Sequence, residues 1–447
     1  MNTGLRKSGT FFLLFGVLAL MSLSACEEPE VILAGKREAL RADEASSAEL
    51  SGTQKENRAL PFAPGPEVKN SNWHQRHNSP HTRVSHPAFA GALEPIWSVD
   101  IGEGNSRYGR ITSEPVVAQG VVYTLDSEAR VSATSTSGAA LWSVSLVPDR
   151  DSARDATGGG LAYAKGRLFV TSGFGFVSAL DATTGERLWQ QALLASTSGL
   201  PTVRDGILYL VAGDSTAWAL DTQTGRTLWQ LGAASDDNNV MGAAAPAVDE
   251  RVAVFAFGSN ELQAAFRKGG LRLWDASIPG KRAGLSRSRI SDVTGDPVIV
   301  GTKIYAGTFS GRTVALDAQT GARLWTAEEG PLGAVWVAGG SVFMVSDNNE
   351  LLRLDAQSGE RIWGTKLPFF VTDRPKRQKT IFAHYGPVLA GGRLYVASND
   401  GLIRAFDPTD GSLLKTVELP GGAASSPVFA GEALYVVSAK GQLFAFR

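Results

Sequence analysis

The sequence predicts an all-β protein, an eight-bladed β-propeller, and three observations lead to this prediction. First, the phrase Ala-Leu-Asp-x-x-Thr-Gly-x-x-Leu-Trp occurs at residues 179–189, 219–229 and 315–325. Second, apolar strand-like segments and turns alternate along residues 93–447 with a period of about 40–50 residues, which is typical of radial or stacked repeats. Third, 50 glycines and 20 prolines in 447 residues suit many short strands joined by tight turns.

The first 25 residues predict a targeting segment. Arg6 and Lys7 precede an apolar stretch, residues 11–23, which is short for a membrane span. Leu-Ser-Ala-Cys follows at residues 23–26 and resembles a bacterial lipobox, so the single cysteine, Cys26, is expected to be acylated. The alternative is an ordinary signal peptide cleaved nearby. In either case we expect no disulfide in the mature domain, although its compartment would permit one.

Two irregular segments separate the targeting segment from the repeat. Residues 26–69 are rich in Glu, Ala, Ser, Lys and Pro and lack strand alternation, which predicts a flexible tether. Residues 70–92 contain Trp73 and four of the five histidines, at positions 74, 77, 81 and 86. Imidazoles suit zinc, copper and nickel, but the spacing is irregular and no Cys, Asp or Glu lies among them. We expect a surface strap that packs Trp73 against the ring, with a metal site as the weaker alternative.

Each expected blade begins with two short strands. Clear first strands begin with proline at residues 115, 201, 297, 387 and 427, and weaker ones begin near residues 161, 246 and 334. Second strands are expected at residues 121–125, 168–172, 207–212, 252–257, 303–307, 342–346, 394–398 and 434–438. Their β-branched and aromatic content, with glycines between them, predicts hairpins.

The repeated phrase is expected to supply the third strand, a turn and the start of the fourth strand. Its Asp can accept backbone N–H bonds and its Gly can adopt positive φ. This interpretation assigns the repeated carboxylates to turns rather than to calcium or catalysis: Asp181, Asp221, Asp317, Asp355 and Asp407. An indole four residues after the Gly should pack against the neighbouring sheet while its N–H reaches a carbonyl. The structural tryptophans are Trp97, Trp142, Trp189, Trp229, Trp274, Trp325 and Trp363, and Lys415 stands where the next one is expected.

Both ends of the repeat region are incomplete blades. Residues 441–447 resemble a third strand without a fourth, and residues 95–100 resemble a fourth strand without the first three. Pairing these strands closes the ring and removes two exposed edges. Residues 93–447 are therefore expected to form one domain.

Few features of the sequence point to catalysis. There is no Gly-x-Ser-x-Gly elbow in a strand-to-helix context, no P-loop and no His-Glu-x-x-His, and we expect no catalytic, metal or cofactor site. The net charge of -1 argues against a general nucleic-acid binder. Three insertions interrupt the repeat, at residues 148–160, 275–295 and 367–385, and the last two carry clustered Lys and Arg. Such loops can form a partner-binding face, the alternative being solvated loops.

The repeated phrase resembles that of quinoprotein-type propellers, which two families share. One comprises the PQQ-dependent alcohol dehydrogenases, and the other is the BamB family of lipoproteins in the outer-membrane β-barrel assembly (BAM) complex. The chain is more similar to the BamB family in its lipobox, tether, eight blades, closing strand and length. The enzymes carry an adjacent cysteine pair and a calcium-binding Glu/Asn/Asp set, and Cys26 alone cannot form that pair.

The resemblance implies a non-enzymatic scaffold, lipid-anchored at the periplasmic face of the outer membrane. Its implied partners are the periplasmic domains of BamA, the barrel subunit, with the rest of the BAM complex and unfolded outer-membrane protein clients. The alternatives are a PQQ-dependent dehydrogenase-like enzyme and a propeller that binds a periplasmic polymer or small ligand.

The resemblance also implies that two loops contact BamA. Arg289, Ser291 and Asp292 match one loop, and Val240 and Met241 lie in the other. The family has an Arg where Met241 stands, and it often has a second acid where Thr294 stands, so the match is incomplete at both loops.

Overall fold

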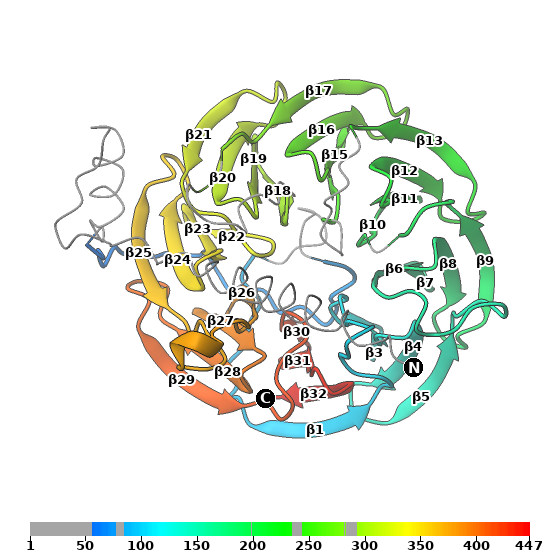
Figure 1. Cartoon of the computed structure of the whole chain (residues 1–447), viewed down its shortest axis with the longest axis horizontal. Helices are drawn as coiled ribbons and strands as arrows, with labels where there is room; N and C mark the ends of the chain where they lie inside the picture. Colours follow the sequence, from blue (N-terminus) through cyan, green and yellow to red (C-terminus); the bar gives the residue numbers. More distant parts are fainter. Residues whose placement is uncertain (1–55, 77–84, 198, 235–243, 281, 283–292) are drawn as a thin grey trace, which may run out of the picture. The chain divides into compact units, whose positions relative to one another are not determined.

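The computed structural model describes residues 56–76, 85–197, 199–234, 244–280, 282 and 293–447. All described residues belong to one compact unit, residues 55–447. This unit contains eight four-stranded sheets arranged in a ring, which confirms the predicted eight-bladed β-propeller (Figure 1). The expected signal peptide, the lipidation residue Cys26 and most of the expected tether lie outside the described residues.

The blades are numbered in chain order. Blades 1 to 4 are β2–β5 (Val116–Ala118, Val121–Leu125, Arg130–Ser135 and Ala140–Ser145), β6–β9 (Gly159–Ala164, Arg167–Ser172, Phe176–Asp181 and Arg187–Ala192), β10–β13 (Thr202–Arg204, Ile207–Val211, Thr216–Asp221 and Thr227–Gly232) and β14–β17 (Ala247–Val248, Val252–Ala256, Glu261–Phe266 and Arg272–Ser277). Blades 5 to 7 are β18–β21 (Gly295–Val300, Lys303–Thr308, Arg312–Asp317 and Arg323–Ala327), β22–β25 (Trp336–Ala338, Ser341–Val345, Glu350–Asp355 and Arg361–Lys366) and β26–β29 (His384–Ala390, Arg393–Ser398, Leu402–Phe406 and Leu413–Glu418). Blade 8 combines β30–β32 (Val428–Ala430, Ala433–Val437 and Gln442–Phe446) with β1 (Pro95–Asp100), and a short 3-10 helix, η2 (Pro375–Arg377), lies between β25 and β26.

Within each blade the four strands are ordered from the ring axis to the rim, with the first strand innermost and the fourth outermost (Figure 1). The second strands are buried over most of their length, as in β11 and β15, because neighbouring blades cover both of their faces. The fourth strands, such as β9 and β13, alternate between exposed and half-buried residues because one face meets solvent. The alternating exposure of these fourth strands therefore reflects their position at the rim of the ring.

The repeated tryptophans connect seven of the eight pairs of neighbouring blades, all but blades 7 and 8. The indole N–H of Trp189 donates to the carbonyl of Thr222 at 3.1 Å, and its ring lies against Gly225, where an added Cβ would fall 2.6 Å from the indole. Gly225 has φ +72°, which favours glycine. Trp97, Trp142, Trp229, Trp274, Trp325 and Trp363 donate in the same way to the carbonyls of Thr136, Ala182, Arg267, Ala318, Ala356 and Pro408.

The carboxylate of the repeated phrase holds the turn that receives the next indole. The Asp181 Oδ1 atom accepts the backbone N–H groups of Thr183 and Thr184 at 2.8 and 3.0 Å. These bonds lower the pKa of Asp181 below its ordinary value, and the bond from Thr184 has the larger effect. The repeated Asp is thus a turn residue in this structure.

Blade 8 is assembled from the two ends of the repeat region. β1 pairs with β32, so the fourth strand of this blade precedes the other three in the chain. Glu94 and Arg447 exchange backbone N–H···O=C bonds of 2.7 and 2.9 Å where the other blades have a covalent turn. Lys415, which stands where the repeat has Trp, donates from Nζ to the carbonyl of Ala92 beside this joint.

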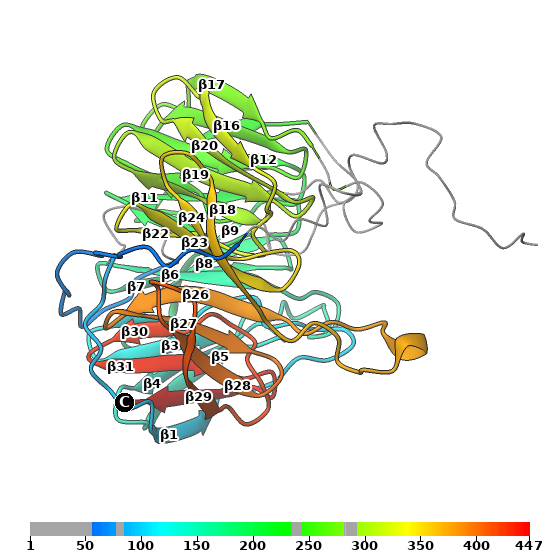
Figure 2. The same ribbon diagram turned by 90° about the vertical axis from the view of Figure 1, so that its left-hand side faces the viewer.

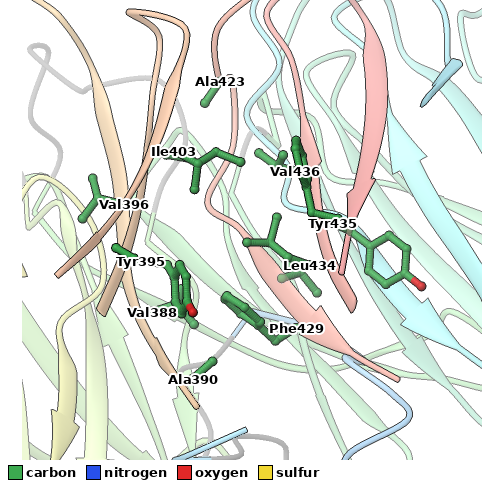
Figure 3. Packing of buried hydrophobic residues seen from close by; sticks show 14 of the residues in the cluster. Val388, Ala390, Tyr395, Val396, Ile403, Ala423, Phe429, Leu434, Tyr435 and Val436 are labelled. Atoms are coloured by element: carbon green, nitrogen blue, oxygen red, sulfur yellow. The ribbon is translucent and has the colours of Figure 1, made fainter. Parts of the chain in front are cut away.

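Apolar side chains fill the spaces between blades. Between blades 7 and 8, Val388 and Tyr395 face Phe429 and Leu434 (Figure 3), and the Tyr395 and Phe429 rings lie 5.0 Å apart. Phe89 completes this cluster with its ring 5.0 Å from that of Phe429. Each such side chain contributes about 1.5–3 kcal/mol when it is fully buried, so these contacts join the blades into one core.

The described part of the segment before β1, residues 56–76 and 85–92, packs against the ring; residues 56–71 are mostly exposed, whereas Trp73 is buried among inner strands. Trp73 forms a bridge with Val117 in blade 1, and its ring stacks on Trp336 of blade 6 at 6.4 Å. The carbonyl of His74 accepts the N–H of Tyr163 in blade 2 at 2.7 Å. Trp73 is only 5% exposed. The physical reason is that the inner strands leave backbone donors and apolar surface at the ring centre, which this segment covers.

Candidate partner-binding face

The ring has two faces that differ in their turns. On one face the first strand turns into the second and the third into the fourth. On the other, which we call the connection face, the second strand turns into the third and the fourth leads to the next blade. The end of a fourth strand is hydrogen-bonded to the turn between the second and third strands of its own blade. The N–H groups of Leu193 and Leu367 donate to the carbonyls of Gly175 and Asn349, both at 2.9 Å. All three insertions join a fourth strand to the next blade, so all belong to the connection face.

The residues expected to contact BamA lie outside the described residues: Arg289, Ser291, Asp292, Val240 and Met241. The strands that flank them are described. β13 and β17 end at the connection face, and β14 and β18 begin there. The two segments therefore join consecutive pairs of blades, 3 to 4 and 4 to 5, on one face of the ring.

A buried hydrogen bond links the residues that follow these two segments. The backbone N–H of Ala245 donates to Oδ1 of Asp296 at 3.0 Å. Both residues are buried, with Ala245 0% and Asp296 1% exposed. Asp296 therefore fixes the distance between the end of one segment and the end of the other.

Asp296 belongs to a buried ionic cluster at the ring centre. Arg76 reaches it from the N-terminal segment with Nε, and Nη1 of Arg76 lies 3.4 Å from Glu114 Oε1 of blade 1. Burial raises the pKa of both carboxyls above their ordinary values, and Arg76 offsets part of that rise. One guanidinium thus joins blades 1 and 5 directly below the connection face.

A second ionic cluster holds the chain at residue 282. Arg282 donates from Nε to Asp347 Oδ2 at 2.6 Å and from Nη2 to Glu329 Oε2 at 2.9 Å. Arg361 lies 3.5 Å from Glu329 and 3.1 Å from Glu350. Burial opposes the charge of Arg282, but Asp347 and Glu329 outweigh it and raise the guanidinium pKa above its ordinary value. Arg282 is one of the clustered cations of the insertion at residues 275–295. It therefore joins blades 5 and 6 and is not available to a partner.

The third insertion forms a hairpin that projects from the connection face. Phe370 and Ile381 form an antiparallel bridge, and Val371 N–H donates to the carbonyl of Thr380 at 3.0 Å. η2 lies at its tip, on the side of the ring opposite residues 56–76 (Figure 2). We call residues 367–383 the basic hairpin because the tip exposes Arg374, Lys376, Arg377 and Lys379.

Two buried side chains hold the base of the basic hairpin. Asn349 donates from Nδ2 to the carbonyls of Pro368 and Phe382 at 3.1 and 2.9 Å. His384 contacts the same Pro368 carbonyl through Nε2 at 2.8 Å and Ser398 Oγ through Nδ1 at 2.6 Å. Burial lowers the pKa of His384 below its ordinary value. The arm is therefore fixed to blades 6 and 7 at its root.

The described residues contain no group of three or more His, Cys, Asp or Glu side chains placed to hold a metal ion. His86 bonds Gly65 O through Nδ1 and accepts Gly392 N–H at Nε2, both at 2.9 Å, so its ring fastens the N-terminal segment to blade 7. His77 and His81 lie outside the described residues. In the part of the chain described here, no helix is long and apolar enough to cross a membrane.

Sequence reasoning missed the two ionic clusters, although one signal was present. Six of the eight first strands of the repeat begin at or near a Pro. The residue before that Pro is acidic in only two of the six, Glu114 and Asp296. This departure marks the two carboxylates that Arg76 joins. The cluster around Arg282 had no comparable signal, because Glu329 and Asp347 lie in turns where acidic residues are ordinary.

A family model described as "Outer membrane protein assembly factor BamB" matches residues 127–365 and 375–447. The BamB of Salmonella typhimurium is 30% identical over 357 residues, which cover 78% of this chain and 88% of that protein. The BamB of Escherichia coli is 29% identical over 355 residues, covering 78% and 87%. Residues 366–374, the end of β25 and the first part of the basic hairpin, fall between the two matched segments.

Solved structures with the same fold include both kinds of propeller. BamB from Moraxella catarrhalis aligns with a TM-score of 0.66 and 18% identity, covering 80% of this chain and all of that one. Quinohemoprotein alcohol dehydrogenase from Comamonas testosteroni aligns with a TM-score of 0.63 and 15% identity, covering 85% and 81%. At these identities the likeness shows the fold alone.

Proposed function

The chain belongs to the family of the outer membrane protein assembly factor BamB, and on this premise we propose that it is a non-enzymatic lipoprotein scaffold of the BAM complex. In this proposal Cys26 is acylated and anchors the chain at the periplasmic face of the outer membrane. The connection face docks on the periplasmic domains of BamA, and the complex assembles and inserts outer-membrane proteins. The lipid raises the effective concentration of the propeller near BamA.

The observation that carries this proposal is the joining of two consecutive connections by Asp296. Its bond to Ala245, and the salt bridge that fastens it to Arg76, set a fixed base under the segments that carry Val240, Met241, Arg289, and Asp292. A rigid base lowers the ordering cost of binding. The structure thus supports the pairing of these two segments as one docking surface.

The ring centre favours a scaffold over a propeller with a central cofactor. The N-terminal segment occupies it with Trp73, Gln75 and Arg76, which contact inner strands of blades 1, 3 and 5. The test is addition of PQQ and calcium to the purified protein. We expect neither quinone absorbance that co-elutes with the protein nor alcohol oxidation, and either result would support the dehydrogenase-like alternative.

A pull-down with purified BamA periplasmic domains tests the docking surface. The double charge reversal Arg289→Glu and Asp292→Lys should reduce BamA recovery at least tenfold. The matched control, Glu186→Lys with Arg187→Glu, reverses an exposed pair on the opposite face and should leave recovery unchanged. Equal recovery by the first variant and the wild type would show that this face is not the BamA contact.

A further inference from the structure

We propose that the basic hairpin binds the anionic lipid headgroups of the membrane to which the chain is anchored, and so orients the connection face toward that membrane. This inference rests on the proposed lipid anchor at Cys26. It concerns a different surface from the BamA-docking segments and names a lipid surface as the partner.

The first observation is the charge of the hairpin tip. Arg374, Lys376, Arg377 and Lys379 are exposed within six residues, with Asp373 the one acid among the exposed tip residues. None of the four forms a salt bridge with any described residue. Cations close to an anionic bilayer are attracted to its negative surface potential and strengthen binding. Unpaired cations at the end of a projecting arm are free to make such contacts.

The second observation is the exposed apolar surface just behind the tip. Val371 is 50% and Ile381 40% exposed, on the two opposed strands of the hairpin. Behind them, Phe369 and Phe370 pack edge to face at 4.7 Å. Basic residues next to aliphatic side chains are typical of segments that lie at a bilayer interface.

The third observation is where the N-terminal segment enters the propeller. Arg58 N–H donates to the carbonyl of Ile362 at 2.9 Å, and Asn57 exchanges side-chain hydrogen bonds of 3.0 Å with Gly364. The segment is therefore antiparallel to β25, and toward its start it heads for Lys366 and the root of the basic hairpin. The described segment thus begins beside the same strand of blade 6 from which the basic hairpin extends.

This third observation favours a lipid surface over an acidic protein. A protein partner free in the periplasm could approach the tip from any direction and would gain nothing from the position of the anchor. A bilayer is held within reach by the residues between Cys26 and Asn57, whose extended length is at most about 100 Å. Acylation combined with a basic patch is a standard means of stable membrane attachment, since either signal alone binds reversibly.

The hairpin root is built to transmit orientation. Asn349 and His384 fix the carbonyl of Pro368, and Asn349 also fixes that of Phe382, so the arm cannot swing freely about blades 6 and 7. Contact of the tip with headgroups would therefore set the direction of the whole ring. The segments proposed to bind BamA would then face the membrane side of the periplasm.

The test uses the mature chain with Cys26→Ser, which cannot be acylated, and vesicles of phosphatidylethanolamine with or without one quarter phosphatidylglycerol. We expect sedimentation with the anionic vesicles, weakening as salt rises, and none with the zwitterionic ones. Replacing Arg374, Lys376, Arg377 and Lys379 with Gln should weaken binding at least tenfold. The charge-preserving changes Arg374→Lys and Arg377→Lys should leave it within about twofold, because the interaction depends on charge.

A matched control replaces four exposed cations of the opposite face, Lys165, Arg187, Arg226 and Lys268, with Gln and should bind vesicles like the parent chain. The proposal is overturned if the four hairpin substitutions leave vesicle binding unchanged, or if the parent shows no preference for anionic vesicles. It is also overturned if those substitutions weaken recovery of BamA but not vesicle binding, since the hairpin would then be a protein contact. The Arg289 and Asp292 reversals change only BamA recovery, so failure of one proposal is distinguishable from failure of the other.

Discussion

At the blade-to-blade contacts that a repeated tryptophan makes, one glycine accommodates one indole. Gly225 combines a positive φ with an indole so close that no Cβ fits, and the corresponding glycines at positions 185, 270, 321, 359 and 411 do the same. The neighbouring turn glycine Gly206 has a similar φ of +84°, but the atom nearest to an added Cβ is 3.8 Å away. A comparison of Gly206 with Gly225 therefore separates the cost of backbone strain from the cost of a steric clash with the indole.

Gly225→Ala should therefore destabilise the protein more than Gly206→Ala. We expect about 1 kcal/mol for Gly206→Ala, from the left-handed backbone alone. For Gly225→Ala we expect about 2–4 kcal/mol, because overpacking against Trp189 adds to the strain. Urea unfolding followed by tryptophan fluorescence measures both changes, and equal losses would show that the indole does not press on this turn.

A second prediction concerns the charges of the buried cluster of Arg76, Glu114 and Asp296. Arg76→Met leaves two buried carboxyls without a cation and should cost about 3–5 kcal/mol near neutral pH. Burial raises the pKa of both carboxyls in the folded state, so the stability they contribute is present at low pH and is lost as the pH rises through the folded pKa. The deficit of Arg76→Met should therefore be smaller at pH 5 than at pH 8.

The control for this prediction is Arg76→Met combined with Glu114→Gln and Asp296→Asn, which removes all three charges. Its unfolding midpoint should recover most of the loss and should vary less with pH. If the single and triple variants unfold alike at both pH values, electrostatic pairing is not what holds the N-terminal segment at the ring centre.

At the scale of structural elements, the projecting arm depends on the buried contacts at its root. His384 is kept neutral by burial, and its pKa lies below the ordinary value of 6.5. The unfolded chain binds the proton more readily, so the contribution of His384 to stability is complete above about pH 6.5 and is lost as the pH falls toward the folded pKa. The loss is at most about 1.4 kcal/mol per pH unit.

His384→Gln removes this titration while a side-chain amide can still reach Pro368. Between pH 6.5 and 5 the melting temperature of the variant should fall less than that of the wild type. His74, whose pKa burial also lowers, is present in both proteins and cancels in the comparison. Parallel pH profiles for the two proteins would mean that His384 is not linked to folding.

At the scale of the whole molecule, the ring is completed by strands from opposite ends of the repeat region. β32 pairs with β31 on one side and with β1 on the other. Its loss would expose two strand edges and open the core between blades 8 and 1. A projecting hairpin has no such role, because its contacts with the ring are confined to its root.

Deletion of residues 442–447 should therefore abolish cooperative unfolding, whereas replacement of residues 372–380 by a short glycine linker should leave it intact. Near-ultraviolet circular dichroism and limited trypsin digestion report the two outcomes, since the tryptophans lie between blades. A truncated chain with a native spectrum and sharp unfolding would show that blade 8 does not close the ring energetically.

The sequence by itself determined the β-propeller with eight blades and the position of each repeated indole. These features are periodic and local, because Asp, Gly and Trp act within one turn and against the next copy of that turn. It also singled out the basic insertion at residues 367–385, since clustered cations interrupt the repeat there.

Only the tertiary structure decided which charges face inward and how the N-terminal segment is placed. Arg282 and Arg76 look like ordinary surface cations in the sequence, yet each is paired with two carboxylates from two different blades. Trp73 was expected to pack against the ring, but its partners, Val117 of blade 1 and Trp336 of blade 6, are set only when the blades surround the ring centre. A contact between residues far apart in the chain leaves no periodic signal, and so it is visible only once the ring has closed.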